Sequence, residues 1–557
     1  MKSNKRELTV TAVILGIILS VVFGAANAYL GLRVGLTVSA SIPAAVVSMG
    51  VLRFLLKRDS MLENNMVQTI GSAGESLAAG AIFTLPALYL WADEGICAPP
   101  GFLPLTVIAL AGGTLGVLFM IPLRKPLIVD EEKTLIYPEG RACAEVIRAG
   151  EKGSGSASLV FGGLGFALLL KLVTDLLKWI PAAVALPFRR IRGELGFEFS
   201  SALAGVGFIV GPKVSTLLFS GAFFGWMILI PVFCLLSDEA ARTYADGGAV
   251  GVWRTYVRFV GAGAIATGGL FSLIKSIPLF VKTFRDSMRG KSSADNQDIP
   301  MPRVIAGVVA VIVMLAALPF VPVGLGGALL IALFGFFFAA VSARMVGLVG
   351  SSNNPVSGMT IATLVVSAFV LKVCGTAGAV GMVASITIGA IVCIVAAIAG
   401  DTAQDLKTGN ILGATPWRQQ IGEFIGVAAS GLAITGVLLL LHKAWGFGGD
   451  AIPAPQATLM KVIIEGIMGG TLPWELLGLG CAVALVLILC RVPVMPFAIG
   501  LYLPIRMNAT IFLGGLLRLL FDRKASALSD RTILFSAGMI AGEGICGILL
   551  AILTLVL

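Results

Sequence analysis

Apolar segments long enough to cross a lipid bilayer recur along the whole sequence, and this repetition restricts the fold more than any other feature. A helix needs about 20 apolar residues to span the hydrocarbon core of a membrane. Segments of that kind begin at Leu8 and continue almost to the last residue. Only 13% of the 557 residues are charged, whereas soluble proteins carry about 25%. The sequence therefore predicts an all-α polytopic membrane protein.

The hydropathy predicts about 16 transmembrane helices, and a range of about 14–17 is compatible with it. The predicted spans are 8–30, 34–56, 66–90, 102–122, 157–180, 198–219, 221–236, 254–275, 303–321, 324–345, 354–373, 377–399, 420–441, 474–490, 493–517 and 532–555. A shorter apolar segment, 458–470, is predicted to be re-entrant. A full span there is the alternative, so the topology of the C-terminal third stays open.

A polar linker divides the predicted chain into two membrane halves. Residues 1–285 form the N-terminal half, which has spans 1–8 and a cytoplasmic loop at 123–156. Residues 286–302 form the cytoplasmic linker, and residues 303–557 form the C-terminal half. Within the 123–156 loop, Pro138 and Gly150 bound a predicted short amphipathic helix.

Basic residues define the expected orientation, because loops rich in Lys and Arg stay in the cytoplasm. Lys2, Lys5 and Arg6 place the N-terminus inside, so we expect a multi-pass protein of the plasma membrane or cell inner membrane. The net charge of +10 comes from scattered loop clusters. It indicates contact with membrane lipids and no binding to nucleic acid.

Polar residues interrupt several apolar segments where a simple membrane anchor has no use for them. Asn27 and Tyr29 precede a glycine-rich break, and Asn353-Asn354-Pro355 lies between two later spans. A proline lacks an amide hydrogen and disfavours a helical conformation of the residue before it, so the backbone there is expected to unwind. Broken helices with polar groups at membrane depth are typical of a solute pathway. For the second motif, an ordinary loop is the alternative.

Two segments, 207–221 and 500–514, align without gaps and indicate internally duplicated halves with broken or re-entrant helices. The matched residues are Gly207 with Gly500, Lys213 with Arg506, Phe219 with Phe512 and Gly221 with Gly514. Chance similarity between apolar segments is the alternative. Paired interrupted helices in two halves favour a central binding site.

Seven residues are candidates for substrate binding. Lys213 and Arg506 lie in apolar surroundings, where a cation needs a partner or a wet cavity, and a substrate carboxylate would be such a partner. A structural ion pair with Glu543 or another carboxylate is the alternative. The full set of candidates is Asn27, Tyr29, Lys213, Asn353, Asn354, Tyr502 and Arg506.

Acidic residues in apolar surroundings are candidates for proton coupling, because desolvation favours their protonated form. Glu75 and Glu423 are predicted to carry the coupling proton. Glu63, Asp401, Gln404 and Asp405 are predicted to form a gate. For each acid, a helix cap or a structural ion pair is the alternative interpretation.

Several classes of function lack the residues that they need. His442 is the only histidine, and the eight cysteines form no CxxC pair. We therefore predict no metal site, no cofactor and no catalytic residues, and we do not expect an enzyme. A metal carried inside a chelator remains compatible with this composition.

The chain resembles the oligopeptide transporter family, specifically its bacterial branch, which is related to the yellow stripe-like transporters. The resemblance is carried by NAYLGLRVGLTVSASIPAAVVSM, ENNMVQTIGSAGESLAAGAIFTLPAL, YPEGRACAEVIRAGE, GDTAQDLKTGNILGATPWRQQ and PVMPFAIGLYLPI. It implies a secondary carrier, usually proton-coupled, for short peptides or for metal chelates of the nicotianamine type, and a homodimer is a family-level expectation. The Asn-Pro-Gly motif of the fungal and plant peptide branch is replaced here by Asn354-Pro355-Val356.

Two functions follow as hypotheses. The first is a proton-coupled importer of short oligopeptides or peptide-like metal chelates that works by alternating access. The alternative is an uncoupled channel or facilitator for small polar solutes, in which the acids only line a pore. The sequence does not choose between peptide and chelate.

Overall fold

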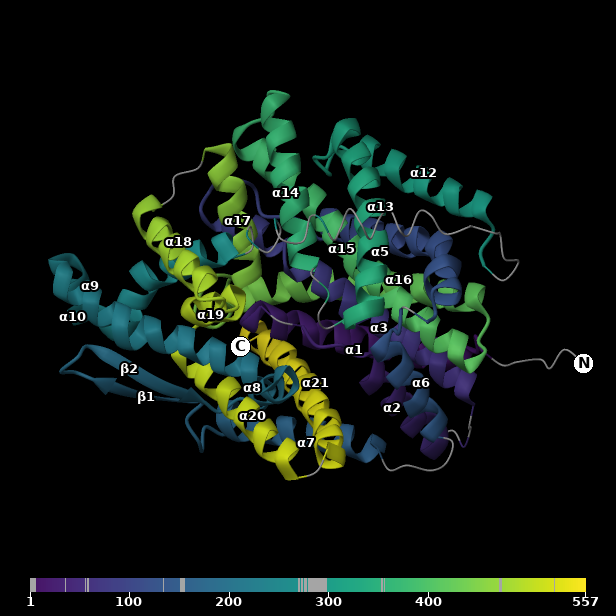
Figure 1. Cartoon of the computed structure of the whole chain (residues 1–557), viewed down its shortest axis with the longest axis horizontal. Helices are drawn as coiled ribbons and strands as arrows, with labels where there is room; N and C mark the ends of the chain where they lie inside the picture. Colours follow the sequence, from purple (N-terminus) through teal and green to yellow (C-terminus); the bar gives the residue numbers. More distant parts are fainter. Residues whose placement is uncertain are drawn as a thin grey trace, which may run out of the picture.

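Apolar segments of the chain fold into helices, because inside a bilayer every backbone polar group has to be satisfied internally. Figure 1 shows the computed structural model, which is mostly helical. The structure describes residues 7–556 apart from 36, 56, 58–59, 134, 151–155, 269–270, 272–273, 275–277, 279–297, 352–353, 355, 470–472 and 525. Most of the predicted linker 286–302 therefore lies outside the described residues.

The helices pack in two groups (Figure 1). The first group surrounds one long helix, α15 (Gly378–Leu412), which is buried over nearly its whole length. Its other members are α1 (Val10–Val34), α2 (Ser41–Gly50), η1 (Val51–Leu55), α3 (Met61–Ile82), α4 (Pro86–Asp93), α5 (Phe102–Arg124), η2 (Lys125–Asp130), α6 (Pro138–Gly150), α12 (Met301–Ala317), α13 (Gly324–Val349), α14 (Val356–Val373), α16 (Pro416–Trp445) and α17 (Pro455–Met468).

The second group is built around two long helices, α8 (Ser201–Phe224) and α21 (Ser526–Val556). Its other members are α7 (Ser156–Lys171), η3 (Leu172–Leu176), β1 (Ala183–Phe188), β2 (Gly193–Glu198), η4 (Gly225–Leu229), α9 (Ile230–Leu236), α10 (Asp238–Val252), η5 (Trp253–Val257), α18 (Trp474–Leu489), α19 (Val494–Tyr502) and α20 (Ile505–Lys524). Helices α1 and α16 contact α21 and join the two groups. Each group contains helices from both sides of residues 286–302.

Eight helices in the described part of the chain are long and apolar enough to cross a membrane. Four shorter apolar helices accompany them: Ser41–Arg53, Ser158–Thr174, Met301–Ala317 and Trp474–Leu489. The helical membrane-protein class is therefore confirmed, and the count of about 16 spans stays a prediction. One predicted span, 493–517, is divided between α19 and α20, because Pro504 ends the first helix.

A β-hairpin is the part of the fold that the all-α prediction missed. Strands β1 and β2 pair antiparallel, with Ala183 opposite Glu198 and Phe188 opposite Gly193. The turn contains Arg192 with a positive φ of 54°. The predicted amphipathic helix, by contrast, is confirmed as α6, which begins at Pro138 and ends at Gly150.

Helices α8 and α20 cross antiparallel at glycines, with the C-terminal part of α19 continuing the contact. A Cβ atom added at any of four glycines would overlap a carbonyl oxygen of the opposite helix: Gly207 with Ile511, Gly221 with Phe497, Gly500 with Leu218 and Gly514 with Ala204. These contacts come in two equivalent pairs, because aligning Gly207 with Gly500 also aligns Leu218 with Ile511. The rings of Phe219 and Phe512 stack between them with centroids 4.9 Å apart. Close approach of small residues is the usual way to join helices in lipid.

Replacing Gly207 by Ala should destabilise this crossing. The added methyl group has no space against the backbone of Ile511, and overpacking of this kind costs about 1–3 kcal/mol. We expect a lower apparent melting temperature of the purified protein in detergent. Gly165→Ala in α7 is the matched control, because nothing lies within 4 Å of its added Cβ; equal melting temperatures for the two variants would contradict the prediction.

Candidate functional site

A pocket of about 300 Å³ opens between α4, η5 and α17, and we call it the large pocket. Its volume is at the lower end of the range for small-molecule sites. Both signs of charge line it, in the residues Asp93, Glu94, Arg254, Arg258, Lys461 and Glu465. Aromatic rings of Phe259, Phe447 and Tyr502 complete the wall.

The charged groups of the large pocket are held in place by one another. Lys461 Nζ lies 3.0 Å from both Glu94 Oε1 and Glu465 Oε1, and Trp91 donates a 2.8 Å hydrogen bond to Glu465. Tyr502 is buried and accepts a 2.8 Å hydrogen bond from Arg258. Fixed charges of both signs around one pocket suit a solute that carries an amine and a carboxylate.

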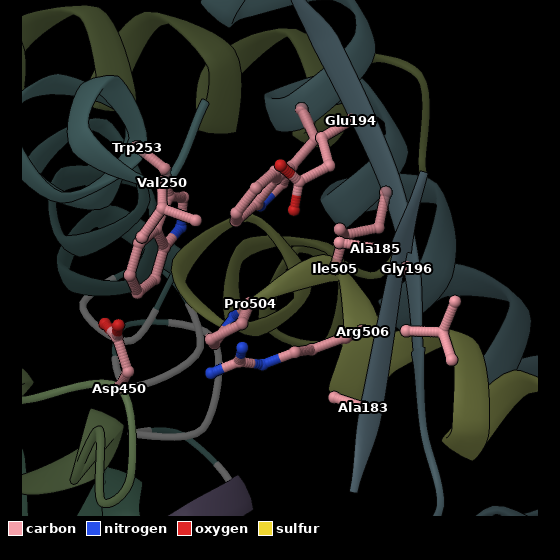
Figure 2. Close-up of a pocket in the computed structure, with 12 residues that line it drawn as sticks. Ala183, Ala185, Glu194, Gly196, Val250, Trp253, Asp450, Pro504, Ile505 and Arg506 are labelled. Carbon is pink, nitrogen blue, oxygen red and sulfur yellow. The ribbon is translucent and has the colours of Figure 1, made fainter. Parts of the chain in front are cut away.

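A second, smaller pocket lies under the β-hairpin, and we call it the hairpin pocket. It has a volume of about 90 Å³ and is lined by β1, β2, Trp226, Trp253 and the break between α19 and α20. Figure 2 shows Arg506 extending along its floor toward Asp450. Asp450 is paired with Arg254 of the large pocket at 2.8 Å, so the two pockets share one ion pair. Tyr502 and Arg506, both predicted to bind substrate, thus lie at neighbouring pockets on either side of one helix break.

A buried ion-pair network joins the two groups of helices, and we call it the Arg33 network. Arg33 of α1 pairs with Glu198 at the end of β2 and lies 3.7 Å from Glu543 of α21. Glu543 is fully buried and also accepts hydrogen bonds from Ser200, from Ser201 and from the Ala202 amide. The carboxylate thus caps the N-terminus of α8 and neutralises an arginine.

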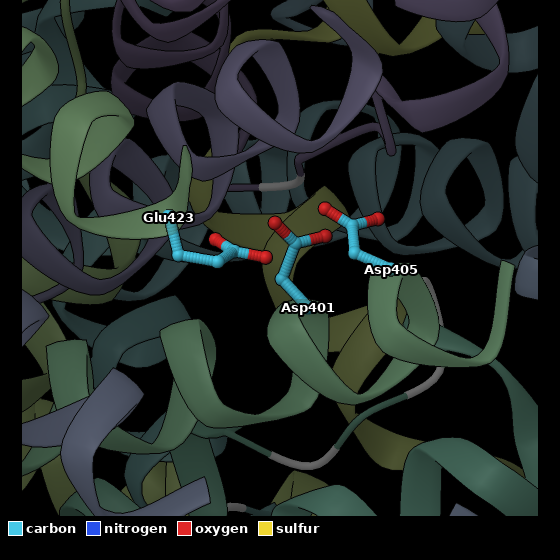
Figure 3. A group of neighbouring side chains, drawn as sticks. All are labelled: Asp401, Asp405 and Glu423. Atoms are coloured by element: carbon cyan, nitrogen blue, oxygen red, sulfur yellow. The ribbon is translucent and has the colours of Figure 1, made fainter. Parts of the chain in front are cut away.

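Three carboxylates meet in the first group of helices, and we call them the carboxylate cluster. Figure 3 shows the carboxylate of Asp401 between those of Asp405, which is also on α15, and Glu423 of α16. One oxygen from each lies within 4.8 Å of the others, and all three residues are buried. Asp401 and Asp405 share a face of α15 because they are four residues apart.

Only one member of the carboxylate cluster has hydrogen-bond donors. Asp405 accepts from the Gln68 amide and the Ser72 hydroxyl of α3. Within the described residues, no oxygen of Asp401 or Glu423 has a hydrogen-bond partner, and no lysine or arginine is paired with the cluster. Carboxylates this close and this dry repel one another unless a cation or a shared proton lies between them.

The donor set of the carboxylate cluster consists of oxygen atoms alone. It is suited to protons or to a hard cation, and the three residues that could hold such an ion are Asp401, Asp405 and Glu423. Glu75, on the neighbouring helix α3, is not one of the three. Its carboxylate accepts a 3.4 Å hydrogen bond from the Ala40 amide at the start of α2. Glu75 thus also acts as a helix cap.

The amphipathic helix α6 covers the same region. Gly140 donates a 2.7 Å hydrogen bond from its amide to the Gln404 side chain, and its carbonyl accepts one from Thr408. Glycine is required there, because a Cβ would contact the Gln404 backbone. Gln404, predicted as a gate residue, therefore holds α6 against α15. Glu63, also predicted as a gate residue, lies on α3 and is buried.

The remaining predicted residues lie elsewhere. Asn27 of α1 stabilises the segment between α1 and α2, because its side chain accepts a 3.0 Å hydrogen bond from the Val38 amide in that segment. Asn354 donates to Ser342 at 2.7 Å, and Asn353 lies outside the described residues. Lys213 is exposed, beyond a kink at Gly211. The structure brings none of the three described residues, Asn27, Lys213 and Asn354, to either pocket.

Tyr29 lies in the wall between the two groups. Its hydroxyl accepts a 3.4 Å hydrogen bond from Arg33, and its ring lies 6.2 Å from that of Trp445.

Sequence reasoning missed Arg33, Arg258 and Lys461, which appear in the sequence as isolated basic residues. Only the tertiary contacts bring them to a site.

Comparison with known proteins places these features in context. The family model described as OPT oligopeptide transporter protein matches residues 7–554. A Haemophilus influenzae protein named "Putative oligopeptide transporter" is 35% identical over 590 aligned positions, which cover 94% of this chain and 92% of that protein. Metal-nicotianamine transporter YSL3 of Arabidopsis thaliana is 24% identical and covers 96% of this chain and 89% of its own length. Probable metal-nicotianamine transporter YSL13 of Oryza sativa subsp. japonica is also 24% identical, with 98% and 85% covered.

Proposed function

Because this chain belongs to the OPT oligopeptide transporter family, we propose that it imports short oligopeptides or peptide-like metal chelates as a secondary active transporter. The large pocket is the observation that carries this proposal. It offers three cationic and three anionic side chains around about 300 Å³. Peptides and chelators of the nicotianamine type both carry amines and carboxylates, so both fit this chemistry.

Substrate enters from the side on which the large pocket opens. With a cytoplasmic N-terminus, the connection between α4 and α5 is external, and Asp93 and Glu94 of that connection line the pocket. The solute replaces the partners of Arg258 and Lys461 with its own charged ends. The hydroxyl of Tyr502, which also contacts Pro453 at 3.1 Å, marks the inner wall.

Proton coupling is assigned to the carboxylate cluster together with Glu75. Glu423 and Asp401 have no hydrogen-bond donors among the described residues, so each can take a proton without losing an existing contact. Asp405, held by Gln68 and Ser72, supplies the fixed negative charge. This extends the predicted coupling pair to two residues that the sequence assigned to the gate.

Alternating access requires that the two sides of the pathway open in turn. We assign the internal gate to α6, which Gln404 holds against α15 through Gly140. The Arg33 network joins the two groups of helices whose relative movement would open the pathway. The duplicated segments, in α8 and in α19–α20, both lie within the second group and pack against each other, so in this scheme they move as one unit.

Uptake into liposomes tests this proposal. Purified protein is reconstituted and given an inward proton gradient with a radiolabelled tripeptide, glutathione or iron–nicotianamine. Accumulation above equilibrium that an uncoupler abolishes is the expected result, and the class that accumulates identifies the substrate. Equilibration without accumulation would favour the uncoupled facilitator, and no uptake of any of the three would overturn the proposal.

Arg258→Gln should weaken substrate binding at the large pocket. A hydrogen bond to a charged group contributes about 1.5–3 kcal/mol, so we expect KM for uptake to rise about tenfold or more with little change in the maximal rate. Arg189→Gln, in the exposed turn of the hairpin, is the matched control. An unchanged KM in Arg258→Gln would remove this residue from the site.

A further inference from the structure

The hairpin pocket contains three buried hydrogen-bond donors that have no acceptor. They are Trp226 Nε1, Trp253 Nε1 and Arg506 Nε, and none of them has a hydrogen-bond partner among the described residues. All three residues line the same cavity of about 90 Å³, and Figure 2 shows Trp253 and Arg506 there. Buried polar groups are nearly always hydrogen-bonded in proteins, so three unpartnered donors around one cavity indicate a ligand that accepts hydrogen bonds.

The two indole groups are fixed donors. Trp226 and Trp253 are 2% and 1% exposed, and their rings stack with centroids 5.7 Å apart. Each lies in a π-helical turn, η4 or η5, and such turns frequently occur at functional sites. A buried indole normally has a partner for its N–H group, and the described part of the chain supplies none for either.

Positive charge and a helix N-terminus are added by the break between α19 and α20. Pro504 ends the break, and α20 begins at Ile505, so the first free amides of a 20-residue helix lie at the cavity wall. The N-terminus of a helix attracts anions. Arg506 approaches the hairpin closely because residue 196 is glycine: a Cβ there would lie 3.2 Å from the Cβ of Arg506.

Two acids in the lining, Asp450 and Glu194, and a third acid behind it, Glu198, restrict what can bind. Asp450 uses Oδ2 to pair with Arg254, and its Oδ1 is buried without a hydrogen-bond partner among the described residues. Glu198 forms an ion pair with Arg506 Nε at 4.0 Å behind the cavity. Burial raises the pKa of Glu194, and the charge of Arg506 lowers it by less. A raised pKa favours the neutral form of Glu194, so repulsion of an incoming anion is strongest at high pH and weakens as the pH falls.

We propose that the hairpin pocket is a carboxylate-binding site. The indole N–H groups, Arg506 and the start of α20 would surround the two oxygens of one carboxylate. A volume of about 90 Å³ holds such a group with a short attached chain and no whole tripeptide. The large pocket lies across the Asp450–Arg254 pair, so the site would take the carboxylate end of a solute whose remainder occupies the large pocket. This last assignment rests on the proposed function. The alternative ligand is a free small carboxylate that binds in the hairpin pocket by itself.

Direct binding tests the cavity without reference to transport. Purified protein is titrated calorimetrically with acetate and with acetamide, its neutral counterpart of similar shape. We expect saturable binding of acetate alone, and at least a tenfold rise in Kd in the Trp226→Phe/Trp253→Phe variant, which keeps both rings and removes both N–H groups. Arg506→Gln should have the same effect. Trp474→Phe, at a position that is 61% exposed, should bind acetate normally.

Tripeptide uptake then identifies the source of the carboxylate. Triglycine and its C-terminal amide are compared in liposomes: a half-saturating concentration about tenfold lower for the free acid, with the difference lost in the double Trp variant, supports a substrate subsite. Acetate binding with equal uptake of acid and amide supports a site for free carboxylates. Equal titration by acetate and acetamide would overturn the proposal. If no tripeptide accumulates, the proposed function fails. The acetate titration would still show whether the hairpin pocket binds a carboxylate.

Discussion

Glu423→Gln is expected to abolish proton-driven accumulation while leaving equilibration of substrate across the membrane. Glutamine keeps the size of the side chain and can neither take up nor release a proton. An inward gradient of about two pH units is worth about 2.7 kcal/mol per proton and supports about 100-fold accumulation. We therefore expect the ratio of internal to external substrate to fall from about that value to about one. Asp401→Asn should have the same effect, since both side chains lack hydrogen-bond donors in the described structure.

The measurement is steady-state accumulation in liposomes, with counterflow of labelled substrate as a test of correct folding. Glu475→Gln is the matched control, because Glu475 is exposed in the first turn of α18. If Glu423→Gln accumulates substrate as well as the natural protein does, the carboxylate cluster does not carry the proton. Loss of counterflow as well would show a folding or binding defect instead of uncoupling.

Arg33→Met is expected to destabilise the protein by about 3–5 kcal/mol. The arginine is 7% exposed, and its removal leaves Glu198 with the more distant Arg506, at 4.0 Å, and the fully buried Glu543 with Lys171, at 3.7 Å. Breaking a buried ion pair by removing one partner has this cost because the other charge stays buried. Unfolding in detergent, followed by circular dichroism, gives the difference.

A surface pair provides the control for this prediction. Arg254 is paired with Asp450, yet its side chain is 59% exposed, so Arg254→Gln should cost no more than about 1 kcal/mol. Adding Glu198→Gln to Arg33→Met should restore part of the lost stability, because it removes a carboxylate that has lost its nearest cation. If Arg33→Met and Arg254→Gln unfold together, the Arg33 network does not stabilise the contact between the two groups of helices.

The sequence allowed prediction of the features that depend on neighbouring residues. Apolar segments predicted the membrane class, and family resemblance predicted relatives that are transporters and not enzymes. Pro138 and Gly150 predicted the ends of α6, because both act on the local backbone. The hairpin was missed because AVALPF is apolar throughout and has no alternation of polar residues that would indicate a strand.

Features that depend on distant residues could not be predicted. Asp401, Asp405 and Glu423 were selected singly for their apolar surroundings, and only the packing of α15 on α16 brings them into one cluster. Arg258 and Lys461 come from helices about 200 residues apart, and no local pattern marks them. Lys213 matches Arg506 in the sequence alignment, and the kink at Gly211 leaves its side chain exposed.

The length of α15 has a consequence for the driving force. Its 35 residues extend over about 52 Å, and Asp401 lies about 35 Å from its first residue. Met468 of α17 lies against Gly381 near that first residue, so the large pocket, to which α17 contributes Lys461, lies toward the opposite end from the carboxylate cluster. The hydrocarbon core is only about 30 Å thick. A cation that enters with the substrate and reaches the cluster would therefore cross most of the transmembrane electric field, which is worth about 2.3 kcal/mol per charge at 100 mV. Membrane voltage alone, without a pH difference, should then drive uptake.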